Sequence, residues 1–298
     1  MTLEVLLQNI SNGFAYGCLY ALIAIGYTMV YGILRLINFA HGNIFTTGAY
    51  IAYVLYSVLN GNWILAYILA MCLTGFIGVV TDRIAYKPIR NAPRISALIS
   101  AIAVSFIIEN LLIIIFGGRP LAFPKISVLD KIFNFGGITI PSINIAIVLI
   151  SAIVLIMLML LLYKTKPGLA MRALSSDFDT ARLMAMDVDK IVALTFAVGS
   201  AIAALGGIMY ASKFPQIYPY MATMPGLKAF IAAVVGGIGN VQGAFIGGLL
   251  LGLIEILFVG IFPSLSGYRD AIAFIVLIII LLYKPTGIMG GKSGRVKV

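Results

Sequence analysis

Residues 143–163 read INIAIVLISAIVLIMLMLLLY, a run of 21 residues without a charged side chain, and Lys164 follows it. An apolar helix of about 20 residues spans the hydrocarbon core of a bilayer. The whole sequence agrees with that reading: 62% of its 298 residues are hydrophobic, only 10% are charged, and the mean hydropathy is +1.10. Soluble domains carry about 25% charged residues. The chain is therefore predicted to be an integral membrane protein.

Further apolar runs, bounded by charge, glycine or proline, predict a series of membrane spans. Unpaired backbone groups are costly in lipid, so the spans are expected to be helices; their length argues against barrel strands. The shortest, 226–239, either crosses as a short helix or re-enters. We expect an all-α, polytopic transmembrane helical bundle of about 8–9 spans in a single domain, 1–298. The predicted spans are 10–34, 37–59, 64–84, 95–116, 141–163, 191–211, 226–239, 241–260 and 268–283.

The basic residues are distributed unequally between the two predicted sides. Lys and Arg in short loops mark the cytoplasmic side of a membrane protein, and nine spans place the termini on opposite sides. The C-terminus is thus predicted to be cytoplasmic. This topology also explains the net charge of +10, so no nucleic-acid partner is expected. Most of the 20 basic residues fall on the cytoplasmic side: Arg35, Arg83, Lys87, Arg90, Arg94, Lys164, Lys166, Arg172, Arg182, Lys190, Lys284, Lys292, Arg295 and Lys297.

The cytoplasmic segment of about 164–190 has the pattern of an amphipathic helix. Ser176 or Asp177 can cap its second half, and Asp179 and Arg182, three residues apart, can pair. Such a helix is either a lever that a peripheral protein grips or a solvated interfacial helix of no special purpose. Its apolar residues recur at helical spacing and are Met171, Leu174, Phe178, Ala181, Ala185 and Val188.

A second polar constellation, Asn38-Phe39-Ala40-His41-Gly42, lies between the first two predicted spans. Asn and His side chains can satisfy the free backbone groups of helix ends, and Gly42 permits a sharp turn. His41 is the only histidine, so no site with several histidine ligands is possible. With Cys18 and Cys72 in apolar runs, no metal site is expected. A structural role of His41 is favoured over gating or pH sensing.

Two acidic residues, Glu109 and Glu255, lie deep within predicted spans. A carboxylate there costs about 2.5–3.5 kcal/mol, so it usually faces a cavity or a partner. Each is expected either to hydrogen-bond between helices or to contact the ammonium group of a substrate. Asn110 is expected to point to another face of its helix. Lys228 is placed near an outer helix end, where it can extend to the lipid headgroups.

Many of the 31 glycines lie within the predicted spans. Small residues four apart allow helices to approach closely in lipid. For Gly236, Gly237 and Gly239 the alternative is a broken helix that lines a polar pathway. A similarity between 42–51 and 239–246 is too short to establish an internal repeat.

Several separated blocks resemble the permease subunits of bacterial branched-chain amino acid ABC transporters, the high-affinity leucine, isoleucine and valine importers of the inner membrane. The likeness covers nearly the whole chain, in order. Its blocks are PGLAMRA at 167–173 with Asp177, ARLM at 181–184, LTFAVGS at 194–200, YALIAIGYT at 20–28 with Tyr31-Gly32, NFAHG at 38–42, LKAF at 227–230, GGIG at 236–239, Gly243-Ala244 and PTG at 285–287.

The resemblance implies an ABC importer permease fold with a cytoplasmic coupling helix in a bacterial or archaeal cell (inner) membrane. It implies as partners a second homologous permease subunit, two cytoplasmic ATPase subunits and a periplasmic or extracellular solute-binding protein, besides membrane lipid. The ATPases would hydrolyse ATP, so this chain is expected to be no enzyme and to carry no cofactor. The expected coupling residues are Gly168, Arg172, Ala173, Asp177, Asp179, Ala181 and Arg182. The candidate pathway or gating residues are Asn38, His41, Glu109, Asn110, Gly236, Gly237, Gly239 and Glu255.

Three alternatives remain open at this level. The same fold could import another small solute, such as another amino acid, an amide, urea or a sugar. The chain could be an ATP-independent secondary transporter or channel, which needs no amphipathic segment at 168–188. An intramembrane enzyme needs a convergent reactive set, which one histidine and two buried carboxylates supply poorly.

Overall fold

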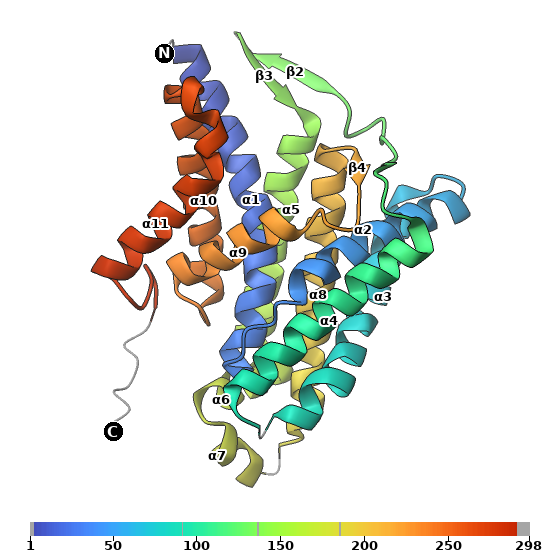
Figure 1. Ribbon diagram of the computed structural model, residues 1–298, viewed down its shortest axis with the longest axis vertical. Coiled ribbons are helices and arrows are strands. Elements are labelled where there is room, and N and C mark those ends of the chain that lie inside the picture. Colours follow the sequence, from blue (N-terminus) through green and yellow to red (C-terminus); the bar gives the residue numbers. More distant parts are fainter. Residues whose placement is uncertain (1–2, 91, 136, 185, 291–298) are drawn as a thin grey trace.

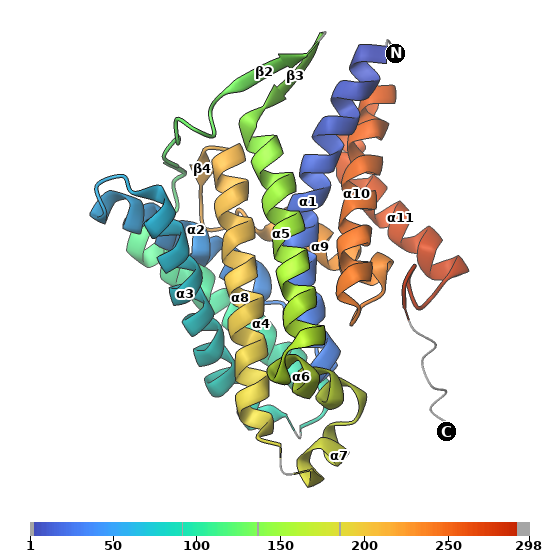
Figure 2. The ribbon, with the colours of Figure 1, turned by 180° about the vertical axis from the view of Figure 1, so that it is seen from behind.

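The computed structural model describes residues 3–90, 92–135, 137–184 and 186–290, and these form a bundle of long helices (Figures 1 and 2). The helices are α1 Leu3–Leu34, α2 His41–Val58, α3 Trp63–Thr81, α4 Arg94–Phe116, α5 Ser142–Lys164, α6 Lys166–Ser176, α7 Phe178–Leu183, α8 Val188–Lys213, α9 Thr223–Gly236, α10 Val241–Ile261 and α11 Arg269–Tyr283. Short helical turns lie at Asp82–Tyr86, Lys87–Ile89 and Pro263–Tyr268. The predicted polytopic helical bundle is confirmed.

Two small antiparallel sheets accompany the helices. Strand β1 (Leu121–Ala122) pairs with β4 (Gln216–Ile217), with Leu121 opposite Ile217. Strand β2 (Ile132–Phe135) pairs with β3 (Ile138–Pro141), with Phe133 opposite Ile140. The β2–β3 hairpin lies at the end of the bundle where α1 begins, and α6 and α7 lie at the opposite end (Figure 1).

Among the described residues, seven helices are long and apolar enough to cross a membrane. They correspond to α1, α3, α4, α5, α8, α10 and α11, the last of these extended by its preceding turn. The predicted spans 37–59 and 226–239 are not among them, so the count of 8–9 is not confirmed. The first contains the shorter helix α2, which begins with the polar residues His41 and Asn43, and the second contains the shorter helix α9, which ends at Gly236.

The helices α2 and α9 begin inside the bundle and not at its surface (Figure 1). Each follows a long helix after a non-helical segment, 35–40 before α2 and 214–222, which contains β4, before α9. Their first turns meet: a Cβ atom built on Gly42 would lie 3.6 Å from the Cβ of Ala222. Two helix N-termini therefore come together where irregular backbone is covered by protein, as lipid requires.

The bundle contains an inverted repeat. Helix α1 packs against α10 as α8 packs against α3, and α2 packs against α8 as α9 packs against α1. Along the chain α1 runs towards the α6–α7 end, whereas α8 runs away from it (Figure 2). Inverted repeats of this kind are common in membrane transporters. The sequence similarity between 42–51 and 239–246 does not reflect this repeat, because it aligns the start of α2 with the start of α10.

Glycines bring the paired helices of both halves into backbone contact. On the first seam, a Cβ on Gly252 would lie 2.2 Å from the backbone nitrogen of Gly17. On the second, a Cβ on Gly78 would lie 2.7 Å from the carbonyl oxygen of Phe196. Nothing larger than hydrogen fits at either position. Tight packing is thus the observed role of these glycines, as small residues in membrane helices predict.

Gly252→Ala tests the first seam. The added methyl group must separate α1 from α10, and overpacking of this kind costs about 1–3 kcal/mol or more. The melting temperature of the purified protein in detergent should fall clearly. Gly118→Ala is the control, because a Cβ on Gly118 meets nothing within 4 Å and should leave the melting temperature unchanged. Equal melting temperatures for the two variants would contradict the close packing.

Candidate functional sites

The predicted coupling segment is a corner of two short helices, α6 and α7, beneath α5. Thr165 caps α6 by accepting a hydrogen bond from the Gly168 N–H at 3.2 Å. A Cβ on Gly168 would lie 2.0 Å from the carbonyl oxygen of Leu161, so glycine is required where α6 folds back on α5. The buried face of α6 carries Met171 and Leu174, as the periodicity predicts.

Arg172 is held by the chain itself. Its Nε donates a hydrogen bond to the carbonyl oxygen of Leu162 at 3.1 Å, and its guanidinium group lies 4.8 Å from the centre of the Tyr163 ring. Positive side chains favour a helix C-terminus, where carbonyl groups are free. Arg172 thus joins α6 to the end of α5, a structural contact that the sequence did not indicate.

Asp177 separates α6 from α7 and, of the two residues suggested as caps, it is the one that caps α7. Its Oδ1 accepts from the Thr180 N–H at 3.0 Å and its Oδ2 from the Thr180 hydroxyl at 2.6 Å. Ala181 is buried and Ala173 half-buried, while Arg182 lies over the Phe178 ring. The side chain of Asp179, and with it the expected pair with Arg182, lies outside the described residues.

The exposed surface of the same corner carries polar and charged side chains together with three large apolar ones. Leu183 and Met184 are 86% and 72% exposed, and Leu169 is also exposed. Helices α6 and α7 lie at the end of the bundle opposite the β2–β3 hairpin (Figure 1). Large apolar side chains gathered on a surface often mark an interaction site.

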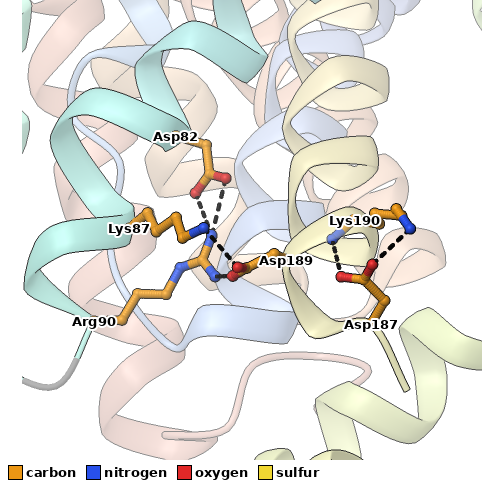
Figure 3. Close-up of polar contacts among 6 residues, drawn as sticks. All are labelled: Asp82, Lys87, Arg90, Asp187, Asp189 and Lys190. Atoms are coloured by element: carbon orange, nitrogen blue, oxygen red, sulfur yellow. Dashed lines mark hydrogen bonds and ion pairs between the residues drawn. The ribbon is translucent and has the colours of Figure 1, made fainter. Parts of the chain in front are cut away.

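An inner ion cluster of Asp82, Lys87, Arg90 and Asp189 lies beside this corner (Figure 3). Arg90 donates to both carboxyl oxygens of Asp82, at 2.7 and 2.9 Å, and to Asp189 at 2.7 Å. Lys87 pairs with Asp189 at 2.6 Å. The cluster fastens the turn after α3 to the first turn of α8.

The neighbouring pair of Asp187 and Lys190 is different, because both side chains are exposed. Asp187 caps α8 by accepting from the Lys190 N–H at 3.1 Å. The hydrogen bond from the Lys190 side chain lowers the pKa of Asp187 below its ordinary value. Exposed pairs of this kind contribute little to stability.

The segment before α2 is folded into the bundle, and its polar side chains are hydrogen-bonded there only in part, since Nδ2 of Asn38 has no partner among the described residues. Asn38 is buried; its Oδ1 accepts from the Tyr86 hydroxyl at 2.6 Å and from the Ala40 N–H at 3.1 Å. His41 is buried against α1: a Cβ on Gly26 would lie 2.2 Å from its Nε2. Among the described residues that Nε2 has no hydrogen-bond partner. Asn38 thus makes structural contacts, whereas the expected structural role of His41 stays a prediction.

The glycine run after α9 breaks the helix, as its composition predicts. Gly236 ends α9, and Gly237 and Gly239 adopt φ values of +110° and +94°, which favour glycine. Asn240 then caps α10 by accepting from the Gly243 N–H at 3.1 Å. The run packs against residues 287–290.

An outer ion cluster surrounds Glu255, which is fully buried on α10. Its carboxylate accepts from the Tyr20 hydroxyl at 3.0 Å, from Lys228 at 2.5 Å and from Nε of Arg269. Lys228 also pairs with Asp270 at 2.6 Å. Of the two roles expected for Glu255, the interhelical one is therefore seen, linking α1, α9, α10 and α11.

The expectation that Lys228 extends to the lipid headgroups is wrong. Its side chain is 7% exposed and lies between Glu255 and Asp270. The error comes from the helix boundary, because α9 begins inside the bundle and its first turns do not reach the membrane surface.

Glu109 and Asn110 lie on α4, a helix that is largely exposed along its length. Glu109 is half-buried, and Asn110 is exposed and donates to the Phe106 carbonyl oxygen at 2.8 Å. Asn43 reaches the same helix by donating to Ser105. The structure does not bring Glu109 near Glu255.

No group of three or more metal-ligating side chains occurs among the described residues. The chain combines an inverted repeat, two helices that begin inside the bundle, and an amphipathic corner at one end. These features define the class: a multi-pass membrane transport protein.

Comparison with known proteins identifies the family. Residues 9–281 match the model of the branched-chain amino acid transport system permease component. The chain is 38% identical to the high-affinity branched-chain amino acid transport system permease protein LivH of Salmonella typhimurium, and 36% identical to the corresponding protein BraD of Pseudomonas aeruginosa. Both matches cover 95% of each chain. No solved structure matches. The chain belongs to the branched-chain amino acid transport permease family.

Arg90→Ala tests the inner ion cluster. It leaves the buried Asp82 carboxylate without its partner, a change that costs about 3–5 kcal/mol in comparable sites. The melting temperature should fall much further than in Lys190→Ala, which removes an exposed pair. Adding Asp82→Asn to Arg90→Ala should restore part of the loss, because it removes the unpaired charge. If Arg90→Ala and Lys190→Ala melt alike, the cluster does not hold α8.

Proposed function

We propose that the chain is the transmembrane permease subunit of an ATP-binding-cassette importer that moves leucine, isoleucine and valine across the cell membrane. The observation that carries the proposal is the 38% identity, over 95% of both chains, to a high-affinity branched-chain amino acid permease. A zwitterion with an apolar side chain needs a pathway of the same mixed character. The interior of the bundle is mostly apolar and also holds sparse polar groups such as Asn38, His41 and Glu255.

The chain itself is proposed to do no chemistry. Two cytoplasmic ATPase subunits would hydrolyse ATP and push on the corner formed by α6 and α7. Helix α6 packs against α1, α5 and α8, so a force on it reaches three membrane helices at once. The expected coupling residues divide into two kinds. The first kind, Gly168, Arg172 and Asp177, shapes the corner, and the second, Ala173, Ala181 and Arg182, lies along its two helices. The exposed Leu169, Leu183 and Met184 were not expected as coupling residues, and we add them as the surface that would receive the partner.

The remaining partners follow from the same proposal. A solute-binding protein would deliver the amino acid at the β2–β3 end, and the α6–α7 end and C-terminus would face the cytoplasm. A second, homologous permease subunit would complete the pathway in the inner membrane.

The exposed α4 face is a natural place for that subunit, because Glu109 otherwise meets lipid at a cost. Gating roles for Asn38, His41, Asn110 and the Gly236–Gly239 run rest on their position where helices are broken or exposed. Measuring uptake by a Glu109→Gln variant tests the proposed role of Glu109 at the contact with the second subunit.

Uptake by the reconstituted complex tests the function. Proteoliposomes that contain both permease subunits and both ATPases, supplied with binding protein and ATP, should accumulate labelled leucine, isoleucine and valine. Omission of ATP should abolish accumulation. Accumulation of a sugar or urea in place of these amino acids would show the same fold with another cargo, and accumulation without ATP would show a secondary transporter.

Leu183→Glu tests the coupling surface. The side chain is 86% exposed, so the fold should tolerate the charge, whereas an apolar interface with the ATPase should not. Loss of one apolar anchor costs more than about 1 kcal/mol, so co-purification with the ATPase and ATP-driven uptake should both fall, by about tenfold at 1.4 kcal/mol. Val128→Glu, an exposed residue before the β2–β3 hairpin, is the control and should keep its ATPase. Normal co-purification of Leu183→Glu would contradict this surface.

A further inference from the structure

A pocket of about 300 Å³ lies beside the outer ion cluster, between α1, α8, α9 and α11. This volume is at the small end of the range for ligand pockets. One part of its lining, the charged wall, carries ionised side chains, and another, the aromatic wall, carries rings. The two walls meet where the Arg269 guanidinium group lies 4.6 Å from the centre of the Tyr16 ring. The residues that line the pocket include no glycine of the helix seams and no residue of the α6–α7 corner, so the features described above do not account for them.

The aromatic wall is formed by Tyr16, Tyr210 and Phe214. The ring of Phe214 lies 5.6 Å from that of Tyr16 and 4.9 Å from that of Tyr210. Met224, on the first turn of α9, adds a flexible apolar side chain that is 49% exposed. Flat rings and a methionine adapt well to a branched aliphatic group.

The charged wall is formed by Lys228, Arg269 and Asp270, with Glu255 behind them. Glu255 holds the Nε of Arg269 and the ammonium group of Lys228. Arg269 is left 30% exposed and Asp270 48% exposed. Arg269 and Asp270 are therefore partly accessible from the pocket, whereas their partners, Glu255 and Lys228, are buried.

The outer ion cluster is electrically balanced, with two carboxylates and two cations. A net-charged ligand would upset that balance, whereas a zwitterion would preserve it. The planar guanidinium group of arginine suits a carboxylate, and the free side of a carboxylate suits an ammonium group. Arg269 and Asp270 are consecutive residues and both line the pocket. The two charged groups of an α-amino acid are attached to one carbon atom, so a positive and a negative side chain close together match them.

A larger cavity, of about 840 Å³, connects this region to the β2–β3 end. It shares Tyr16, Phe214 and Arg269 with the pocket and adds Lys213. The ammonium group of Lys213 lies 5.0 Å from the centre of the Tyr16 ring and is bonded to the neutral Asn144. The approach to the pocket is thus positively charged on the side from which the substrate would arrive, and it would attract the carboxylate end first.

We propose that this pocket is a binding subsite for a single α-amino acid on its way through the permease. Arg269 binds the carboxylate, Asp270 binds the ammonium group, and Tyr210, Phe214 and Met224 contact the aliphatic side chain. Lys228 and Glu255 are positioning residues that fix the two contacting groups. The inference rests on the proposed function and adds to it a site within the membrane subunit itself.

Direct binding to the assembled membrane complex, purified without the solute-binding protein, tests the subsite. Labelled leucine should bind, and unlabelled leucine should compete better than leucinamide, which lacks the carboxylate, or 4-methylpentanoate, which lacks the ammonium group. Asp270→Asn should remove the preference for leucine over 4-methylpentanoate, and Arg269→Gln the preference over leucinamide. Each lost charged contact should weaken leucine binding by about tenfold or more.

Two further variants protect the test against misfolding. Met224→Ala alters only an exposed side chain and should lower the preference for leucine over alanine. Lys190→Gln, at the opposite end of the bundle, should bind leucine as the unchanged protein does. All variants are first compared by melting temperature.

The outcomes separate the subsite from the function. If the complex imports leucine but binds none without the binding protein, or if Asp270→Asn, Arg269→Gln and Met224→Ala all bind as the unchanged protein does, the subsite is wrong and the importer stands. If the complete system imports no branched-chain amino acid, the proposed function itself fails.

Discussion

Inside a bilayer, every backbone N–H and C=O group needs a partner within the protein, since lipid offers none. This chain interrupts its helices before α2, before α9 and after α9, and it places each interruption against other helices. Asn38 and Asn240 supply side-chain oxygens to backbone N–H groups exposed there. The need to cover these interruptions decides how the rest of the bundle packs.

Helices must approach closely to cover irregular backbone. The glycines between α1 and α10 and between α3 and α8 permit this close approach. Helix α1 packs against α8, α9 and α10, so it is the helix on which most of the cover depends. Gly26 illustrates the constraint, because the imidazole of His41 occupies the space that any side chain at position 26 would need. The local sequence and the tertiary packing are consistent only with glycine there.

The sequence predicts those features that depend on local pattern. The long apolar helices, the break at Gly236–Asn240 and the amphipathic corner follow from composition and periodicity. The ion clusters do not, because Arg90 meets Asp189 across 99 residues, and Lys228 meets Glu255 only because α9 begins within the bundle. The sequence did not indicate the inverted repeat either, because the two halves have equivalent helix pairings but no recognisable sequence similarity. The family resemblance identified the class of protein without indicating any of these contacts.

Helix α8 extends from the inner ion cluster to the pocket beside the outer ion cluster. Its first turn carries Asp189 of the inner cluster, and its last turns carry Tyr210 and Lys213 beside the outer pocket. A helix of 26 residues extends about 39 Å. The aromatic wall of the pocket is carried partly by α8, whereas the charged wall is carried by α9 and α11. Helix α6 packs against α8, so a displacement that begins at the α6–α7 corner would reach the aromatic wall through α8, whereas the buried contacts of Glu255 involve α1, α9 and α11 and not α8.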